Sequence, residues 1–459
     1  MTATTFKITL SDKLRLAHIP ADLRDELILR LTLKNPKWLE NERMGRWNKG
    51  VAKRLRFYEE TENDTLTIPR GFIRQLLLMC RKHKIAYLLE DKRRLLPPVT
   101  LHFEGKLKPF QQEAVRAMQA KYFGTLNAPT GSGKTVIALY LIAIRQQPAL
   151  IIVHTKALAF QWVNRIETFL GIKHDEIGFI GDGKKKIGDQ ITVALVQSLY
   201  KCAQEVAPHI GFLIVDENHR CPSRIFTEAV TQFDSQYMLG LSATPFRRDK
   251  LTKLIFWHLG DMHHDVKKSR LIATGDVLAV DVIIRKTEFK PYYDPFHDYS
   301  KMLAELCADD LRNRLITQDV AWESQNSPGV CLVLSDRKKH CANLQSLLKY
   351  KHHIDADILT GDLNNRQRQS VVERLDAGQV KVLVATGQLI GEGFDCKNLA
   401  TLFLATPIRF SGRLVQYLGR ILRPAQGKVK ARVFDYVDIY VEPLLAAAKA
   451  RQRVYQNDS

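Results

Sequence analysis

The chain has 459 residues, enough for two or three domains, and its hydrophobic content of 45% is normal for packed cores. Its 69 lysines and arginines exceed its 49 aspartates and glutamates, which gives a formal net charge of +20. This composition excludes a disordered chain and favours a polyanionic partner such as nucleic acid, although a basic surface can also serve solubility alone.

The compartment is indicated by two other features of the sequence. The seven cysteines are scattered without a CxxC pair, so neither a zinc site nor a disulfide framework is indicated. The first residues lack the apolar segment of a secretion signal, and no run approaches 18 apolar residues. We therefore expect a cytoplasmic protein of a bacterial or phage-infected cell, nucleoid-associated if bacterial, with no membrane partner.

Residues 1–100 are the most basic part of the chain, with 21 lysines and arginines against 12 aspartates and glutamates. Between residues 35 and 58, tryptophan and tyrosine interleave with arginine and lysine. That mixture suits phosphate contacts combined with base stacking. Core packing of the aromatic side chains is an equally open alternative. We predict a small basic α+β domain here.

From about residue 125, short apolar runs alternate with longer segments whose apolar residues have helical spacing. Such runs suit strands that are buried on both faces of a parallel sheet. The runs cover residues 149–153, 191–196, 212–215, 330–334, 382–385 and 402–405. The alternation predicts an α/β fold with doubly wound parallel sheets. Because the first series ends near residue 241 and the second begins near residue 330, we predict two such domains.

A phosphate-binding loop is predicted at residues 128–135, between a short apolar approach at 124–126 and the helical segment 135–145. Its glycines let backbone N–H groups converge on phosphate oxygens, Lys134 can bridge the β- and γ-phosphates of ATP, and Thr135 can hold Mg²⁺. Ala128 stands where the consensus has its first glycine. The residues expected to bind ATP here are Ala128, Pro129, Thr130, Gly131, Ser132, Gly133, Lys134 and Thr135.

Two adjacent carboxylates, Asp216 and Glu217, follow the apolar run 212–215. They would lie at the carboxyl edge of a buried sheet, where ligands of open α/β folds bind. Asp216 can hold Mg²⁺, and Glu217 can orient and deprotonate the attacking water. A solvated acidic turn is the alternative, and the phosphate-binding loop upstream argues against it. The sequence therefore predicts an ATPase that uses Mg²⁺.

Further short motifs carry a resemblance to a known family. They are LKPFQQ at 107–112, TKALAFQW at 155–162, VQSL at 196–199, SAT at 242–244, LTGD at 359–362, VATG at 384–387, GEGFD at 391–395 and QYLGRILR at 416–423. With the two ATP motifs, the series resembles superfamily 2 helicases. It is closest to the XPB, UvsW and restriction-subunit-like branch, and in particular to UvsW-type branch-migration helicases. The sequence DENH at 216–219 is typical of the DExH group rather than of DEAD-box RNA helicases.

The resemblance implies a role for five further residues at the nucleotide. Gln111 would read the adenine edge, and Gly393 and Asp395 would face the nucleotide. Arg420 and Arg423 would reach across a cleft to stabilise charge on the γ-phosphate, and would join Lys134, Asp216 and Glu217 as catalytic groups.

The resemblance also implies roles at the nucleic acid. Strand contacts would come from Thr155, Gln197, Thr360 and Thr386. Coupling between hydrolysis and the nucleic-acid groove would involve Ser242, Thr244 and Gln416. In this sequence His154 stands where proline is usual before Thr155.

The resemblance implies two tandem RecA-like domains and an ATP-dependent DNA helicase or translocase that remodels forks or junctions in recombination, repair or replication. Its partner would be single-stranded, duplex or branched DNA, with 3′ to 5′ movement. Three alternatives stay open: a restriction-system motor, an RNA-directed helicase and a non-catalytic nucleic-acid clamp. A nuclease of the first kind would need a site such as Asp281 with Glu288 and Lys290.

The expected organisation has five parts. They are a basic N-terminal DNA-binding domain at residues 1–100, an ATP-binding RecA-like domain at 101–255, a connector at 256–310, a second RecA-like domain at 311–445 and a C-terminal tail at 446–459.

Overall fold

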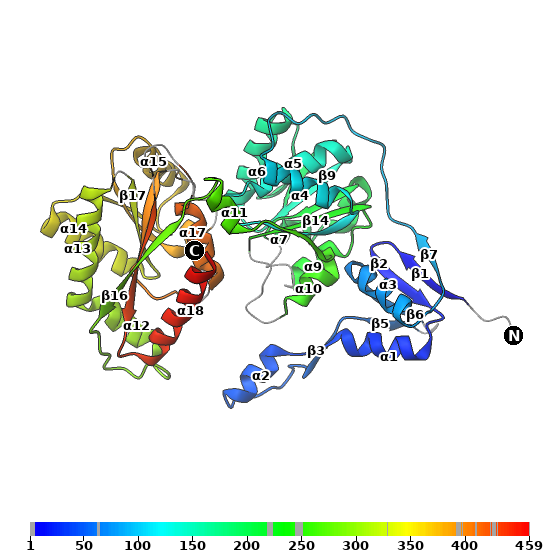
Figure 1. Ribbon diagram of the computed structural model, residues 1–459, viewed down its shortest axis with the longest axis horizontal. Helices are drawn as coiled ribbons and strands as arrows, with labels where there is room; N and C mark the ends of the chain where they lie inside the picture. The colour runs from blue at the N-terminus through cyan, green and yellow to red at the C-terminus, as the bar shows by residue number, and fades with distance from the viewer. Residues whose placement is uncertain are drawn as a thin grey trace. The chain divides into compact units, whose positions relative to one another are not determined.

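The computed structural model divides into two compact units (Figure 1). One comprises Met1–Ala128 and Gly133–Val266, and the other comprises Pro129–Ser132 and Lys267–Ser459. The structure describes residues 5–61, 65–217, 224–243, 251–327, 329–391, 396, 398–408, 411–422, 424, 428 and 430–458. No helix among these residues combines the length and the apolar character that crossing a membrane requires.

The first hundred residues form a small α+β domain, as predicted. A five-stranded sheet of order β5-β6-β2-β1-β7 is covered by two helices, and its core consists of leucine, isoleucine and phenylalanine side chains. Its elements are β1 (Phe6–Leu10), β2 (Lys13–Ala17), α1 (Ala21–Arg30), β5 (Glu59–Thr61), β6 (Thr65–Pro69), η1 (Arg70–Phe72), α3 (Ile73–Lys82) and β7 (Tyr87–Asp91).

A short segment, which we call the arm, is inserted between α1 and β5 and comprises residues 32–56. Its two three-residue strands pair antiparallel and are joined through one helix and a loop. Its elements are β3 (Thr32–Lys34), α2 (Pro36–Arg43) and β4 (Arg54–Arg56). No residue of α2 is buried.

The rest of the first unit is a doubly wound domain around an eight-stranded sheet of order β11-β10-β12-β9-β13-β14-β8-β15. All neighbouring strands are parallel except the β10–β11 pair. In Figure 1, α4, α5 and α6 lie on one face of the sheet, and α7, α9 and α10 lie on the other. Its elements are α4 (Pro109–Gln119), β8 (Phe123–Asn127), α5 (Lys134–Arg145), β9 (Ala149–Val153), α6 (Lys156–Leu170), β10 (Gly178–Gly181), β11 (Lys184–Lys186), β12 (Ile191–Leu195), α7 (Val196–Leu199), α8 (Ala203–Val206), η2 (Ala207–His209), β13 (Phe212–Val215), α9 (Arg224–Val230), β14 (Tyr237–Ser242), α10 (Lys253–Leu259) and β15 (Met262–Asp265).

The second unit has a six-stranded, all-parallel sheet of order β16-β21-β20-β17-β19-β18. Helices α13 and α14 pack on one face through Ile316, Val320 and Leu344. Its elements are α11 (Lys268–Ala273), β16 (Val280–Thr287), α12 (Tyr299–Ala308), α13 (Asp310–Asn326), β17 (Val330–Ser335), α14 (Lys338–His352), β18 (Ala356–Leu359), α15 (Asn365–Asp376), β19 (Val382–Thr386), α16 (Gly387–Gly391), β20 (Leu399–Leu404), α17 (Ser411–Ile421), β21 (Ala431–Asp438) and α18 (Glu442–Asp458).

The predicted fold class is confirmed, because each apolar run singled out from the sequence is a buried parallel strand. Two segments differ from the expected organisation. Residues 256–310, expected as a connector, contain β15 and β16, which each extend one of the two sheets. Residues 446–459, expected as a tail, contribute to α18, where the buried Arg451 guanidinium binds the carboxylate of Asp435 at 2.7 Å. Pairing and burial of this kind depend on partners distant in the chain, which local pattern does not reveal.

The N-terminal domain is fixed to the doubly wound domain of the same unit through η1 and α10. Arg70 is 3% exposed, and its guanidinium donates to the Ser235 carbonyl oxygen at 3.1 Å. Gly71 lies against the backbone of α10, and Phe72 and Phe57 both contact the Trp257 ring edge-on. The glycine is required by this close approach, since a Cβ atom at residue 71 would lie 2.5 Å from the carbonyl oxygen of Phe256.

Replacing Gly71 with alanine should therefore destabilise the first unit. Overpacking of this kind costs about 1–3 kcal/mol, because backbone atoms of α10 cannot move aside as a flexible side chain can. Thermal unfolding of the full chain should show a lower midpoint. Gly361→Ala is the matched control, because the nearest heavy atom to its added Cβ is 3.8 Å away. Equal midpoints for the two variants would contradict this role for Gly71.

Candidate nucleotide and nucleic-acid site

The first unit places its predicted site residues along one edge of its sheet. Strands β12, β9, β13, β14 and β8 are parallel neighbours, so their carboxyl ends meet at a common edge. The phosphate-binding loop follows β8, Ser242 ends β14, and Asp216 follows β13. Thr155 and Gln197 follow β9 and β12. Residues expected at ATP and residues expected at nucleic acid are therefore neighbours on this edge.

The phosphate-binding loop turns from β8 into α5 as its sequence predicts. Gly131 and Gly133 have φ angles of 91° and 77°, which favour glycine, and Gly133 is the N-cap of α5. Lys134 begins the helix, and its ammonium group donates to the carbonyl oxygen of Ala128 at 3.0 Å. Ser132 donates its hydroxyl to the carbonyl oxygen of Pro129 at 2.7 Å. The helix N-terminus and this lysine together suit a phosphate group.

Gln111 lies beside this loop, on the first turn of α4. Its side-chain oxygen accepts the backbone N–H of Lys108 at 2.9 Å, which fixes the carboxamide. A Cβ atom at Gly133 would lie 2.5 Å from the Gln111 amide nitrogen. The glutamine is 6% exposed and packs on the loop, a position compatible with its predicted contact to the nucleotide.

Asp216 is buried and held in a fixed orientation. One carboxylate oxygen accepts the indole N–H of Trp162 at 2.8 Å, and the other accepts the backbone N–H of Glu217 at 2.9 Å. Trp162 is 1% exposed and lies on α6, which packs against the sheet. A contact from a neighbouring helix therefore aims this carboxylate.

Glu217 has a left-handed backbone, with φ of 54°. This conformation costs a residue with a Cβ of order 1–3 kcal/mol, and such residues gather at functional sites. The hydrogen bond from its N–H to Asp216 helps to hold the turn. Because of this turn, the glutamate lies directly beyond the strand end.

The electrostatics of this acidic pair fit a bound cation. Burial, with the neighbouring Glu217 carboxylate as a second cause, raises the pKa of Asp216 to about 6. The Trp162 hydrogen bond and the Lys134 charge act in the opposite direction. A divalent cation would relieve both the burial cost and the repulsion, so the residues fit Mg²⁺. Asp216, with Thr135 in the first turn of α5, would hold it, and the ion would neutralise phosphate charge.

The two predicted strand-contact residues of this unit lie together. Thr155 is the N-cap of α6, and its hydroxyl accepts the backbone N–H of Leu158 at 3.4 Å. Gln197 is exposed and donates its amide to the carbonyl oxygen of His154 at 3.4 Å. Since Thr155 caps α6 and the helix carries Trp162 two turns later, one helix joins this pair to Asp216.

In the second unit, Thr360 and Thr386 are also adjacent. Leu359 and Ala385 are partners in the β18–β19 pairing, so the next residues stand at neighbouring strand ends. Thr360 is 6% exposed, and its hydroxyl lies 3.5 Å from the Asp362 carboxylate. The two threonines are therefore brought together, although they are 26 residues apart.

Helix α17 carries Arg420 in its last turn and the backbone of Gln416. This helix packs close to the strand-contact threonines, because the hydroxyl of Tyr417 occupies the space where Gly387 would carry a Cβ. The other predicted residues, Thr244, Gly393, Asp395 and Arg423, lie outside the described residues, as does the side chain of Gln416.

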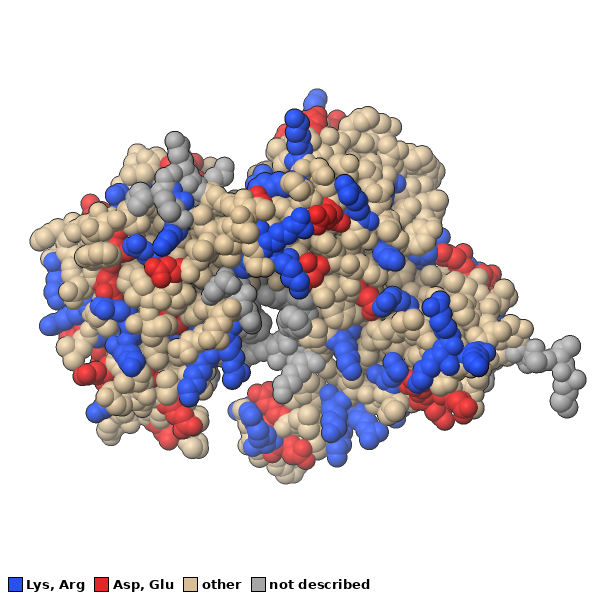
Figure 2. Space-filling model, viewed as in Figure 1, with Lys and Arg blue, Asp and Glu red and all other residues tan. Residues whose placement is uncertain are grey.

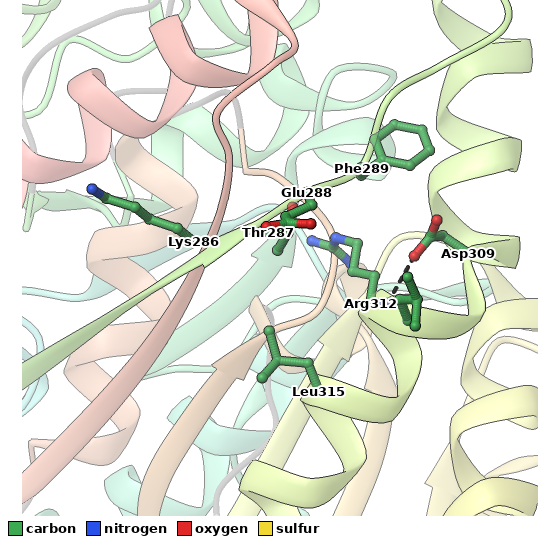
Figure 3. Close-up of a pocket in the computed structure, with 8 residues that line it drawn as sticks. Lys286, Thr287, Glu288, Phe289, Asp309, Arg312 and Leu315 are labelled. Atoms are coloured by element: carbon green, nitrogen blue, oxygen red, sulfur yellow. Dashed lines mark hydrogen bonds between the residues drawn. The ribbon is translucent and has the colours of Figure 1, made fainter.

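The nuclease site considered from the sequence does not form. Asp281 is at the start of β16, and Glu288 follows the end of that strand. At a rise of about 3.3 Å per residue, seven residues of strand separate them by about 23 Å. Glu288 instead lines a cavity of about 230 Å³ with Thr287, Asp309 and Arg312 (Figure 3).

Trp162 is the functional candidate whose role the sequence did not reveal. In the sequence, the tryptophan is only the last residue of a motif that resembles a strand contact. Its hydrogen bond to Asp216 joins residues 54 positions apart. The sequence signal that Trp162 turns inward is its spacing. It lies seven residues, or two helical turns, after the helix cap, among the apolar residues of one helix face.

Comparison with known proteins is consistent with this geometry. Residues 104–247 match the family of the type III restriction enzyme res subunit, and residues 310–425 match the helicase conserved C-terminal domain. Together the two matched regions hold the motor motifs that lie from Gln111 to Arg423.

Two curated relatives cover most of the chain. The putative ATP-dependent RNA helicase L396 of Acanthamoeba polyphaga mimivirus is 25% identical over 78% of this chain and 69% of its own. The DNA 3′-5′ translocase XPB2 of Sulfurisphaera tokodaii is 26% identical over 69% of this chain and 79% of its own. The solved structure of the DNA-bound type ISP restriction-modification enzyme LlaBIII covers 77% of this chain and 30% of its own, with 14% identity and a TM-score of 0.57. It shares the fold.

Two doubly wound sheets with a phosphate-binding loop and an acidic pair define a nucleoside-triphosphate-hydrolysing motor protein with tandem RecA-like domains. The chain belongs to the superfamily 2 helicases, in the branch of the restriction subunits and XPB. It is an ATP-dependent nucleic-acid helicase.

Replacing Lys134 with alanine should abolish most hydrolysis. Loss of one positioned donor to a developing charge lowers kcat by about 10²–10³-fold. Lys349→Ala, at an exposed lysine of α14, is the control and should keep wild-type turnover. Steady-state ATP hydrolysis with saturating nucleic acid measures both. A Lys134→Ala variant with more than about half the wild-type kcat would contradict the assignment.

Replacing Trp162 with phenylalanine removes the donor to Asp216 and keeps most of the apolar volume. Loss of a group that orients a metal ligand costs about 10- to 100-fold in metal affinity or activity. We therefore expect the Mg²⁺ concentration for half-maximal hydrolysis to rise by that factor. Trp322→Phe, at a tryptophan that is 56% exposed, is the control. Lower turnover with an unchanged Mg²⁺ requirement would reduce Trp162 to a packing role.

Proposed function

We propose that this helicase acts on DNA and remodels branched DNA by unwinding forks or moving junctions. The observation that carries the proposal is the rigid attachment of a basic domain to the first motor domain. The attachment uses buried groups, among them Arg70 and Trp257. A surface held in this way moves with the motor domain, so a DNA segment bound there is displaced relative to a strand that the motor pulls.

The charge of the N-terminal domain supports a polyanionic partner at that surface. Figure 2 shows lysine and arginine side chains along its visible face and over the arm. Each phosphate contact releases counterions, which gives strong binding that weakens steeply with salt. The proposed division of the chain keeps residues 1–100 as the DNA-binding domain.

The proposed motor cycle uses the predicted site residues. Lys134 and the loop bind the phosphates of ATP with Mg²⁺, Glu217 deprotonates the attacking water, and Arg420 and Arg423 stabilise charge on the γ-phosphate. Hydrolysis changes the affinities of the two motor domains for one strand out of phase, which produces stepping.

Stepping needs communication between the hydrolysis site and the strand. In the first unit, α6 provides a direct route, because its first turn is capped by Thr155 and its buried face holds Asp216 through Trp162. In the second unit, α17 packs beside the residue that follows Thr386. The backbone carbonyl oxygen of Ser242 accepts the N–H of Ala128 at 2.9 Å and so links β14 to the phosphate-binding loop. We propose that these contacts couple hydrolysis to strand binding.

The choice of DNA over RNA needs its own test, because contacts to the sugar-phosphate backbone carry little information on the bases. One relative is named a DNA translocase and another an RNA helicase. The proposal follows the basic N-terminal domain and the DExH sequence rather than either name.

The test measures ATP hydrolysis by the wild type without nucleic acid and with single-stranded DNA, duplex DNA, a four-way junction and matched RNA at fixed salt. We expect the largest stimulation with the junction, and no stimulation in Lys134→Ala. A fluorescent-strand assay should show ATP-dependent unwinding of a fork. Stimulation by RNA alone would overturn the substrate assignment, and no hydrolysis under any condition would favour the non-catalytic clamp.

A further inference from the structure

The arm presents an indole ring to solvent without a structural reason. Trp47 is 88% exposed, and Leu39 and Met44 nearby are 43% and 46% exposed. The other tryptophan of the arm, Trp38, is already covered, because the Lys53 ammonium lies 4.7 Å from its ring centroid. Among the ring and cation contacts of the described residues, none involves Trp47. A large apolar side chain left open in this way suits an external partner.

The loop that carries Trp47 is held by side-chain hydrogen bonds rather than by a core. Asn41 donates its amide to the side-chain oxygen of Asn48 at 3.0 Å, and Asn48 donates to the carbonyl oxygen of Trp38 at 3.3 Å. Asn35 caps α2 through the N–H of Lys37 and donates to the Ala52 carbonyl oxygen at 2.7 Å. These bonds tie the loop after Trp47 to α2, and the backbone N–H of Arg46, just before it, donates to the Asn41 carbonyl oxygen at 2.8 Å, so little ordering is needed when a partner binds.

The charge of the arm selects the class of partner. Residues 32–56 contain eight lysines and arginines and two glutamates. Arg43, Arg46 and Lys49 flank Trp47 in the sequence and are exposed. Figure 2 shows basic side chains, with some acidic ones among them, on the arm and on the neighbouring part of the domain. Such a surface disfavours a basic or apolar protein and complements a phosphate backbone.

The arm is connected to the motor domain at its base. Phe57 follows β4, donates its backbone N–H to the Leu31 carbonyl oxygen at 3.0 Å and contacts Trp257 of α10 with ring centroids 5.5 Å apart. Trp257 is 2% exposed in the core shared by the N-terminal domain and α10. The arm therefore starts from a fixed base.

We propose that Trp47 stacks on an unpaired base while the arginines and lysines of the arm contact the adjoining phosphates, so that the arm binds the point where duplex DNA opens into single strands. This deepens the proposed function, on which its choice of DNA rests, by naming the substrate feature that the N-terminal domain recognises. A stacked duplex offers no open base face to an indole ring, whereas an unpaired base does. The arm thus distinguishes a fork from a blunt duplex.

The test is binding of the full chain, without ATP, to three DNAs of the same sequence: a fork with unpaired arms, a blunt duplex and a single strand. Fluorescence anisotropy at fixed salt gives each Kd. For Trp47→Ala we expect a loss of about 5- to 150-fold on the fork and the single strand, because stacking on one base has that range of effect. On the blunt duplex the loss should stay below about twofold. Trp47→Phe, which keeps an aromatic face, should retain most of the affinity for the fork.

Two controls separate stacking from charge and from folding. Trp322→Ala removes an exposed tryptophan from α13 and should bind all three DNAs as the wild type does. The double variant Arg46→Ala, Lys49→Ala should weaken binding to every DNA and lower the slope of log Kd against log salt by about 2. Thermal midpoints confirm that each variant is folded.

Fork binding by Trp47→Ala that equals the wild type, or an equal loss on fork and blunt duplex, would overturn the proposal. Because these measurements need no hydrolysis, they are independent of the motor. If the wild type hydrolyses ATP with DNA and Trp47→Ala binds the fork as tightly as the wild type, only the arm proposal is wrong. Tighter binding of a matched RNA fork by the wild type points instead to failure of the DNA assignment.

Discussion

The parallel alignment of β12, β9, β13, β14 and β8 is the constraint on which the site of the first unit depends. Each strand needs a crossover helix, so all five carboxyl ends emerge at one edge and each is followed by a turn free to carry function. The central strands are buried apolar runs that tolerate few polar side chains. Polar chemistry is therefore concentrated where the strands stop, and the phosphate-binding loop, Ser242 and Asp216 become neighbours although 114 residues separate Ala128 from Ser242.

A buried carboxylate at such an edge favours the binding of a proton or a cation. Asp216 is 5% exposed, and the same burial that raises its pKa makes a cation there favourable. The indole N–H of Trp162 limits the cost by satisfying one oxygen and fixing its direction. Because the tryptophan belongs to α6, a shift of that helix would move the donor that holds the carboxylate. The coupling proposed above would use this single contact.

Buried ion pairs play a comparable positioning role in the second unit. Arg312 of α13 binds the Asp438 carboxylate at 2.9 Å, with both side chains 1% exposed, and donates to the Ala405 carbonyl oxygen. Pairs of this kind add little net stability compared with apolar packing, but removing one partner leaves a buried charge. The Arg312 contacts fix α13 against the carboxyl ends of β20 and β21. In the N-terminal domain, the buried Arg70 and the absent side chain of Gly71 similarly determine one docking position against α10.

By itself, the sequence determined the strands, the phosphate-binding loop, the acidic pair and the family. These features depend on local patterns: apolar runs such as 149–153 indicate buried strands, and glycines beside Lys134 indicate a turn that accepts phosphate. The sequence also shows that tryptophans and basic residues alternate near residue 47. It does not show which of these side chains are exposed in the folded protein. Whether an aromatic side chain is buried in a core or open to a partner depends on what packs against it. In the same unit, Trp257 is 2% exposed and Trp47 is 88% exposed.

Only the tertiary structure decided the role of Trp162, the pairing of Thr155 with Gln197 and the pairing of Thr360 with Thr386. It also decided that β15 and β16 extend the two sheets and that Arg451 anchors the last helix to Asp435. Each of these depends on partners at least 16 residues apart, whose meeting follows from strand order and helix packing. Spacing along the chain does not encode that order, because hydrogen bonding, burial and charge act between residues that are close in space.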